Sequence, residues 1–170
     1  MVKPFVIYIV DFTYTQQGLQ SEIAPSAIGG IATYARKIHG DDIQCYVFKQ
    51  PEKFSKAFED RKPDLIGFSN YSWNARLSWA FARRIKKSYP EITIVYGGPH
   101  YPLPRDEQEA YLLEHDEMDY FVIKEGEVGF ASLVGHLKER RGTYPTELIE
   151  SVHWLERETG RFSLAPPSER

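Results

Sequence analysis

This sequence of 170 residues is poor in the residues that build covalent and metal-bound frameworks. Its single cysteine, Cys45, excludes an internal disulfide and any metal cluster held by several cysteines of this chain. Its five histidines do not share the spacing of metal ligands. We therefore expect most histidines to be surface or hydrogen-bonded residues. Cys45, within the apolar run 43–48, is expected to be a small buried side chain.

Long apolar runs and a strong charge imbalance are also missing. No stretch approaches the roughly 18 apolar residues of a membrane-spanning helix. The apolar run 5–10 meets Asp11 without a small-residue cleavage site, so it is not read as a signal peptide. A net charge of −3 gives no general attraction to nucleic acid or an acidic membrane. We expect a cytoplasmic protein with neither partner, and the absent disulfide framework points the same way.

Several common site motifs are missing as well. Neither GxGxxG nor GxxxxGK[ST] follows the first apolar run, which argues against dinucleotide and P-loop sites. Ser69 is followed by Asn-Tyr and not by the glycine pattern of a nucleophile elbow. A response-regulator receiver would need an aspartate at the position where Ser69-Asn70 stand, so that reading is disfavoured.

Apolar strand-like runs alternate with helical periodicity along most of the chain. The expected strands are residues 5–10, 43–48, 65–69, 92–96 and 120–123, and the helices between them begin near residues 25, 51, 73, 106 and 127. This alternation predicts an α/β fold with a doubly wound, five-stranded parallel sheet, Rossmann-like or flavodoxin-like. Residues 152–156 and 161–164 predict a short C-terminal β-hairpin around a glycine turn, followed by linker.

Parallel strands end at one edge of a sheet, where ligands of α/β proteins bind. Four strand-end segments should therefore lie together: the polar loop from Asp11 to Ala24, Ser69-Asn70-Tyr71, Gly97-Gly98-Pro99-His100 and Glu125-Gly126-Glu127. Gly97 and Gly98 remove every Cβ from their turn, which lets the backbone lie close to a bulky neighbour. A tight turn without any ligand is the alternative.

The motifs at these strand ends resemble one family. They are PSAIGGI at 25–31, DLIGFS at 64–69, VYGGPH at 95–100 and DYFVIKEGE at 119–127. In this order they resemble the cobalamin-binding domain at the N-terminus of cobalamin-dependent radical SAM enzymes. The hairpin at 152–164 resembles the segment that leads into the radical SAM barrel. The GGPH turn followed by the EGE turn at this spacing is fairly specific, and the match covers nearly the whole chain.

The resemblance also implies a state of the cofactor. The wider cobalamin-binding fold carries a DxHxxG motif, an SxL and a GG. Asp11 can be aligned with the first, but Thr13 stands at the histidine and Gln16 at the glycine. Ser69 and Gly97-Gly98 fit the other two, with Tyr71 in place of leucine. Cobalamin is thus expected with its dimethylbenzimidazole tail detached and without a histidine on cobalt.

The resemblance assigns the cofactor-binding residues in two groups, with no catalytic or metal-binding residue. The tail slot would be formed by Ser69, Asn70, Gly97, Gly98, Pro99, Glu125, Gly126 and Glu127. The corrin ring would face Thr13, Tyr14, Gln16 and Tyr71. Three residues have structural alternatives: Ser69 as the cap of the next turn, Glu127 as a helix N-terminal carboxylate and His100 as a hydrogen-bonded turn residue.

Domain organisation and activity follow from the same resemblance. Residues 1–145 would form the cobalamin-binding-like domain, and 146–170 the hairpin and linker toward an absent radical SAM domain. Radical SAM chemistry needs three cysteines for its iron-sulfur cluster, so cluster and S-adenosylmethionine would belong to that domain, in cis or trans. This chain would be the non-catalytic, cofactor-holding part of an enzyme of methyl transfer or related radical chemistry. The alternatives are a cobalamin-free relative used for interaction or substrate gating, and an unrelated flavodoxin-like small-molecule binder.

Overall fold

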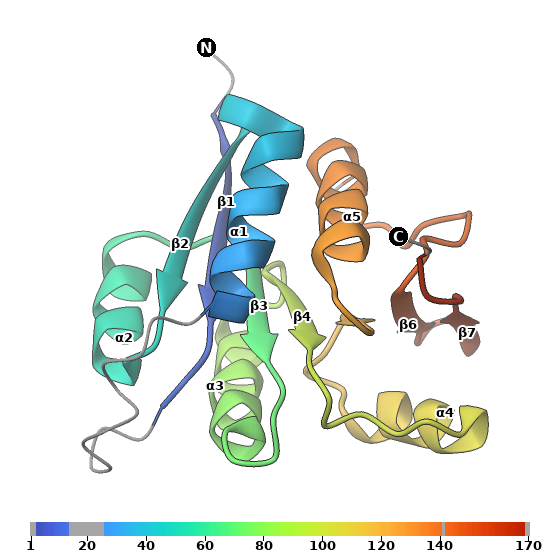
Figure 1. Ribbon diagram of the computed structural model, residues 1–170. Helices are drawn as coiled ribbons and strands as arrows, with labels where there is room; N and C mark the ends of the chain where they lie inside the picture. The colour runs from blue at the N-terminus through green and yellow to red at the C-terminus, as the bar shows by residue number, and fades with distance from the viewer. Residues whose placement is uncertain (1–2, 14–25, 141, 169–170) are drawn as a thin grey trace.

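A seven-stranded sheet forms the centre of the protein. The computed structural model describes residues 3–13, 26–140 and 142–168 (Figure 1). The parallel strands are β1 (Phe5–Val10), β2 (Ile43–Phe48), β3 (Leu65–Ser69), β4 (Thr93–Gly97) and β5 (Tyr120–Val122). They are ordered β2-β1-β3-β4-β5, which confirms the predicted five-stranded parallel sheet.

The predicted hairpin is present and extends the same sheet. Strand β6 (Val152–Glu156) pairs antiparallel with β5, and β7 (Arg161–Leu164) pairs antiparallel with β6. Trp154 of β6 is 1% exposed and belongs to the hydrophobic core. The hairpin therefore covers the edge of β5, a placement that the local sequence pattern does not reveal.

Helices cover both faces of the sheet, as a doubly wound fold requires. They are α1 (Ser26–His39), α2 (Pro51–Asp60), α3 (Ala75–Ser88), α4 (Arg105–Glu114) and α5 (Glu127–Glu139), with a 3-10 turn at Gly40–Asp42. Helices α1 and α5 pack side by side on one face, and α2 and α3 lie on the other (Figure 1). None of the helices in the described ranges is long and apolar enough to cross a membrane.

Strand β1 explains why both faces need cover. Phe5, Ile7 and Ile9 join the core beneath α1 and α5, whereas the alternate residues Val6 and Tyr8 join the core beneath α2 and α3. All six residues of the strand are buried. A continuous apolar run can be satisfied only by two such layers, because successive side chains of a strand point to opposite faces.

Two apolar residues lie outside the core positions that helical spacing predicts for them. The spacing of four from Trp73 to Leu77 predicts an apolar stripe on the third helix, but Trp73 precedes α3 and is 58% exposed. Helical spacing likewise predicts Ile38 on the apolar face of α1, but Ile38 is 53% exposed. The buried positions of α3 include the small residues Ala75, Ser78 and Ala82, which let the helix lie close to the sheet.

A buried histidine ties the hairpin to the turn after β4. The Tyr101 hydroxyl lies 3.1 Å from His153 Nδ1, and His153 Nε2 lies 2.9 Å from the Ala165 carbonyl oxygen. A neutral ring satisfies both contacts, because Nε2 donates to the carbonyl while Nδ1 accepts from the hydroxyl. Burial lowers the pKa of His153 below its ordinary value of 6.5.

This arrangement predicts a pH-dependent stability. The unfolded chain protonates His153 more readily than the folded one, so stability is full above pH 6.5 and falls as pH drops through the lower folded-state pKa. Urea titrations of the wild type and His153→Gln between pH 5 and about 7.5 measure the difference. The variant should lose part of the pH slope. Equal slopes in the wild type and His153→Gln would refute this role.

Candidate functional site

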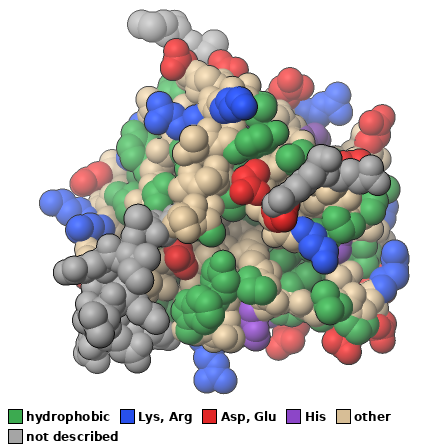
Figure 2. All heavy atoms as spheres, viewed as in Figure 1, with side chains coloured by type: hydrophobic (Ala, Val, Ile, Leu, Met, Phe, Trp, Pro, Cys, Tyr) green, Lys and Arg blue, Asp and Glu red, His purple; other side chains and the backbone are tan. Residues whose placement is uncertain are grey.

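An apolar cavity opens at the carboxyl edge of the sheet. Its volume is about 750 Å³, including space open to solvent, and Figure 2 shows this face hollowed near its centre. Ile9, Gly67 and Val95 of three neighbouring strands form its floor. Ile28 of α1 and Phe130 of α5 form its walls. The cavity therefore runs from the strand ends down between the sheet and the α1–α5 layer.

Most of the predicted site residues meet at this cavity. Those that line it are Ser69, Tyr71, Gly97, Gly98, Glu125, Gly126 and Glu127. Thr13, Asn70 and Pro99 are described but do not line it. Tyr14 and Gln16 lie outside the described residues. Convergence of the strand ends thus places the third, fourth and fifth strand-end segments together as predicted.

A hydrogen-bonded cluster at the mouth joins Ser69 to Asp11. Ser69 Oγ donates to Asp11 Oδ1 at 2.6 Å, and Asn74 Nδ2 donates to the same Asp11 oxygen at 2.9 Å and to Ser69 Oγ at 2.8 Å. Asn74 Oδ1 accepts from the Tyr71 backbone N–H at 2.9 Å, so Asn74, not Ser69, holds the next turn. The single proton of Ser69 is donated to Asp11 and one lone pair of its oxygen accepts from Asn74, which leaves one lone pair as a further acceptor.

Asn70 holds the GGPH turn instead of facing the cavity. It is fully buried, its N–H donates to the Gly97 carbonyl at 2.7 Å, and its carbonyl accepts from the His100 N–H at 3.0 Å. Its side-chain amide donates to the His100 carbonyl and, at 2.9 Å, to the Tyr111 hydroxyl. His100 is therefore fixed in the turn through its backbone.

Three of the four glycines that line the cavity differ in what a side chain there would contact. Gly98 has φ +138°, and a Cβ there would lie 2.7 Å from the Asn70 carbonyl oxygen. A Cβ on Gly97 would lie 3.3 Å from the Val122 carbonyl oxygen. Glycine is thus required at position 98, whereas a Cβ at position 97 would need the Val122 backbone to shift by a few tenths of an ångström. Gly67 is different, since its Cβ would project beside the Phe130 ring at 3.5 Å, so its absence leaves the cavity floor open.

Gly67 and Asp11 line the cavity but are not among the site residues predicted from the sequence. A glycine inside an apolar strand commonly marks a close approach, and this signal was available for Gly67. The pairing of Asp11 with Ser69 joins residues far apart in sequence, so no local pattern could show it.

Charged side chains surround the cavity mouth. The lining contains the carboxylates of Asp11, Glu125 and Glu127 and the amine of Lys124. Glu127 is the first residue of α5 and lies where the helix dipole favours a negative charge. A Cβ on Gly30 of α1 would lie 3.6 Å from Glu127 Oε1, so the two helices begin close together.

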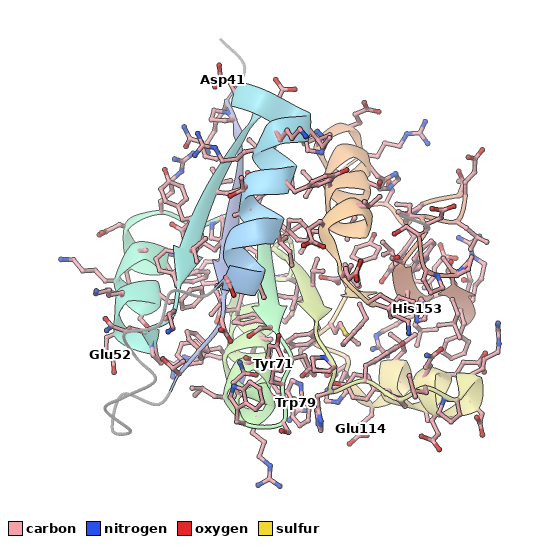
Figure 3. The ribbon with its side chains drawn as sticks, in the orientation of Figure 1. Asp41, Glu52, Tyr71, Trp79, Glu114 and His153 are labelled. Atoms are coloured by element: carbon pink, nitrogen blue, oxygen red, sulfur yellow. The ribbon has the colours of Figure 1, made fainter. Side chains whose placement is uncertain are left out.

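An aromatic pair lies beside the mouth. The rings of Tyr71 and Trp73 stack with centroids 4.5 Å apart and planes at 12°. Tyr71 lines the cavity at the end of β3 (Figure 3), and Trp73 presents most of its surface to solvent. The pair offers a flat apolar surface outside the slot.

Within the described part of the chain, no histidine lines this cavity and no group of three His, Cys, Asp or Glu residues is placed to hold a metal ion. The sequence of residues 14–25 also contains no histidine. His100 lines a separate surface groove beside α4.

Comparison with known families decides the assignment. The B12 binding domain family matches residues 19–134, more than half of the chain. The chain belongs to the B12 binding domain family. This membership and the α/β architecture confirm the resemblance that the strand-end motifs predict.

Two curated relatives of this B12-binding domain are methyltransferases of much greater length. A 2-(S-pantetheinyl)-carbapenam-3-carboxylate methyltransferase of Streptantibioticus cattleyicolor is 34% identical over 71% of this chain and 18% of its own length. The cobalamin-dependent radical SAM methyltransferase TokK of Streptomyces tokunonensis is 36% identical over 43% of this chain and 10% of its own. The chain therefore spans less than a fifth of either relative.

Solved structures share the fold of this B12-binding domain. The cobalamin-dependent S-adenosylmethionine radical enzyme OxsB, with aqua-cobalamin and S-adenosylmethionine bound, superposes with a TM-score of 0.74 at 15% identity, over 99% of this chain and 23% of OxsB. The orphan response regulator HP1043 of H. pylori superposes less well, with a TM-score of 0.51 at 14% identity over 80% of this chain and 97% of its own. At such identities the likeness shows the fold alone.

The glycine geometry predicts opposite effects of two alanine substitutions. Gly98→Ala should lower the free energy of unfolding by about 2 kcal/mol or more, because the new Cβ meets the Asn70 backbone and the φ angle disfavours any side chain. Gly29→Ala in α1 should raise it by about 0.5–1 kcal/mol, because its Cβ enters open space in a helix. Denaturant titration measures both. A neutral Gly98→Ala would contradict the assigned turn geometry.

Proposed function

We propose that this chain is the cofactor-holding part of a cobalamin-dependent radical SAM enzyme of methyl transfer or related radical chemistry. It would hold cobalamin with the dimethylbenzimidazole tail detached and with no histidine on cobalt. The observation that carries this proposal is the apolar slot of a B12-binding domain, open at the carboxyl edge and floored by Gly67.

The lining fits the detached tail. A flat aromatic base suits a slot walled by Ile28, Val95 and Phe130, where burial of apolar surface favours binding. Gly67 keeps the floor free of a side chain that would fill this space. At the mouth, the Ser69 oxygen can accept a hydrogen bond, and Asp11 and Asn74 fix its position. Gly97, Gly98 and Gly126 would border the tail with bare backbone.

The corrin ring would lie outside the mouth. Tyr71 and its stacking partner Trp73 offer a flat apolar surface there and keep water from that side of the ring. Thr13 and Tyr14 remain proposed neighbours of the ring, on the segment that leads away from β1. The absence of any histidine among the described lining residues supports cobalt without a histidine ligand from this cavity. Bound cobalamin would supply a cobalt able to carry a methyl group, while the chain positions and shields it.

The remaining chemistry would come from a radical SAM domain. The much greater length of the two methyltransferases supports a partner domain in cis or trans, carrying the iron-sulfur cluster and S-adenosylmethionine. Residues 1–145 would then bind the cofactor, and 146–170 would lead toward that domain. Trp73 and Leu103, 58% and 83% exposed in the loops after β3 and β4, are apolar surface that such a partner would cover.

Retention of hydroxocobalamin tests the proposal. After incubation and desalting, the wild type should keep the visible spectrum of the corrinoid in about equimolar amount. Ala27→Trp should abolish retention, because Ala27 lines the mouth at the exposed start of α1 and tolerates a large side chain without backbone strain.

The matched control is Thr33→Trp, at an exposed position of the same helix outside the cavity lining. It should retain cobalamin as the wild type does. A colourless wild type would overturn the proposal and favour the cobalamin-free relative, and a copurifying flavin would favour an unrelated binder. Full retention by Ala27→Trp would refute the placement of the tail.

A further inference from the structure

We propose that Lys124 binds the phosphodiester of the cobalamin nucleotide tail and thereby selects complete cobalamins over corrinoids that lack the tail. This inference rests on the proposed function and adds a specificity-determining residue to the same site. Lys124 lies two residues after the end of β5, in the wall of the cavity.

Lys124 is the single cation among the described residues that line the cavity. Its amine makes no ion pair with any other described residue, and the side chain is exposed at the mouth. Two other lysines do form ion pairs, since Lys86 pairs with Asp119 at 2.6 Å and Lys138 with Asp42 at 2.7 Å. Because no described residue forms an ion pair with Lys124, its charge is available for a ligand at the cavity entrance.

The backbone at Lys124 is in an unfavourable conformation. Its φ angle of +60° lies in the left-handed region, where a side chain costs energy that glycine avoids. Gly126, two residues later, also has a positive φ of +79° and is the N-cap residue of α5. Strain of this kind persists where the position of a residue matters. The turn thus carries a lysine where stability alone would favour glycine.

The start of α1 contributes a partial positive charge at the same cavity. Ala27 and Ile28, in the first turn of α1, line the cavity, and that turn contains no acidic residue. Backbone N–H groups at a helix start have no partner within the helix and attract negative charge. Asp11, across the mouth, is already bonded to Ser69 and Asn74. Lys124 and the start of α1 line the same cavity, so both can attract a phosphate bound there.

The other charges of the mouth decide which anion can bind. Asp11, Glu125 and Glu127 outnumber Lys124, so the mouth as a whole does not attract small free anions. Binding of an anion becomes favourable there only when the anion is covalently linked to an apolar group that occupies the slot. A phosphodiester linked to an aromatic base has this combination, and inorganic phosphate does not.

The test compares cobalamin with cobinamide, which has the corrin ring but lacks the phosphate, ribose and base. Lys124→Gln should weaken hydroxocobalamin binding by about tenfold, since it removes one partly exposed charged hydrogen bond. It should leave cobinamide binding within about twofold of the wild type. Lys124→Arg should restore most of the affinity for cobalamin. Lys87→Gln, an exposed lysine of α3 outside the cavity, is the control and should change neither ligand.

Lys124→Gly separates function from folding. It should unfold at a temperature at least as high as the wild type, because it relieves the left-handed strain, while losing cobalamin affinity as Lys124→Gln does. Equal weakening of both corrinoids, or unchanged cobalamin affinity in Lys124→Gln, would overturn the inference and leave the proposed function standing. Displacement of cobalamin by millimolar inorganic phosphate would also overturn it. A wild type that binds neither corrinoid would overturn both.

Discussion

The close approach of Gly98 to the backbone of Asn70 is the contact on which the site depends. It joins the ends of β3 and β4, and the buried Asn70 side chain locks the joint through the His100 carbonyl and the Tyr111 hydroxyl. Ser69, the residue before Asn70, is then held where its hydroxyl meets Asp11 at the end of β1. A side chain at position 98 would separate these strand ends. The protein's own backbone and side-chain contacts therefore form the mouth of the cavity.

The sheet and the location of the site follow from the sequence because both depend on local patterns. Apolar runs separated by helical periodicity predict the strands nearly to the residue, and parallel connections bring their ends to one edge. The hydrogen-bond partners of individual side chains could not be predicted from the sequence. Asp11 with Ser69, and Asn70 with Tyr111, are contacts between distant residues. The prediction for Trp73 was wrong because its spacing of four to Leu77 matches a helical stripe, although Trp73 lies two residues before α3 begins.

Residues at the site meet two different requirements, turn geometry and open space for a ligand, which the sequence alone does not distinguish. Gly97 and Gly98 shape a turn against neighbouring backbone, whereas Gly67 leaves space over the cavity floor. Lys124 and Gly126 share positive φ angles, yet only one of them carries a charge to the mouth. A fold of this type needs the first kind of residue to form its edge. Gly67 and Lys124, which are not needed to form this edge, indicate which ligand the edge binds.

The central claim is that cobalamin sits with its tail in the slot and without a nitrogen ligand on cobalt from this cavity. Electron paramagnetic resonance of cob(II)alamin bound to the protein tests it directly, because a coordinated nitrogen adds its own splitting to the cobalt lines. The account predicts cobalt lines without nitrogen splitting, since the base is detached and no histidine lines the described cavity. Resolved nitrogen splitting, from a retained dimethylbenzimidazole or a histidine, would contradict it.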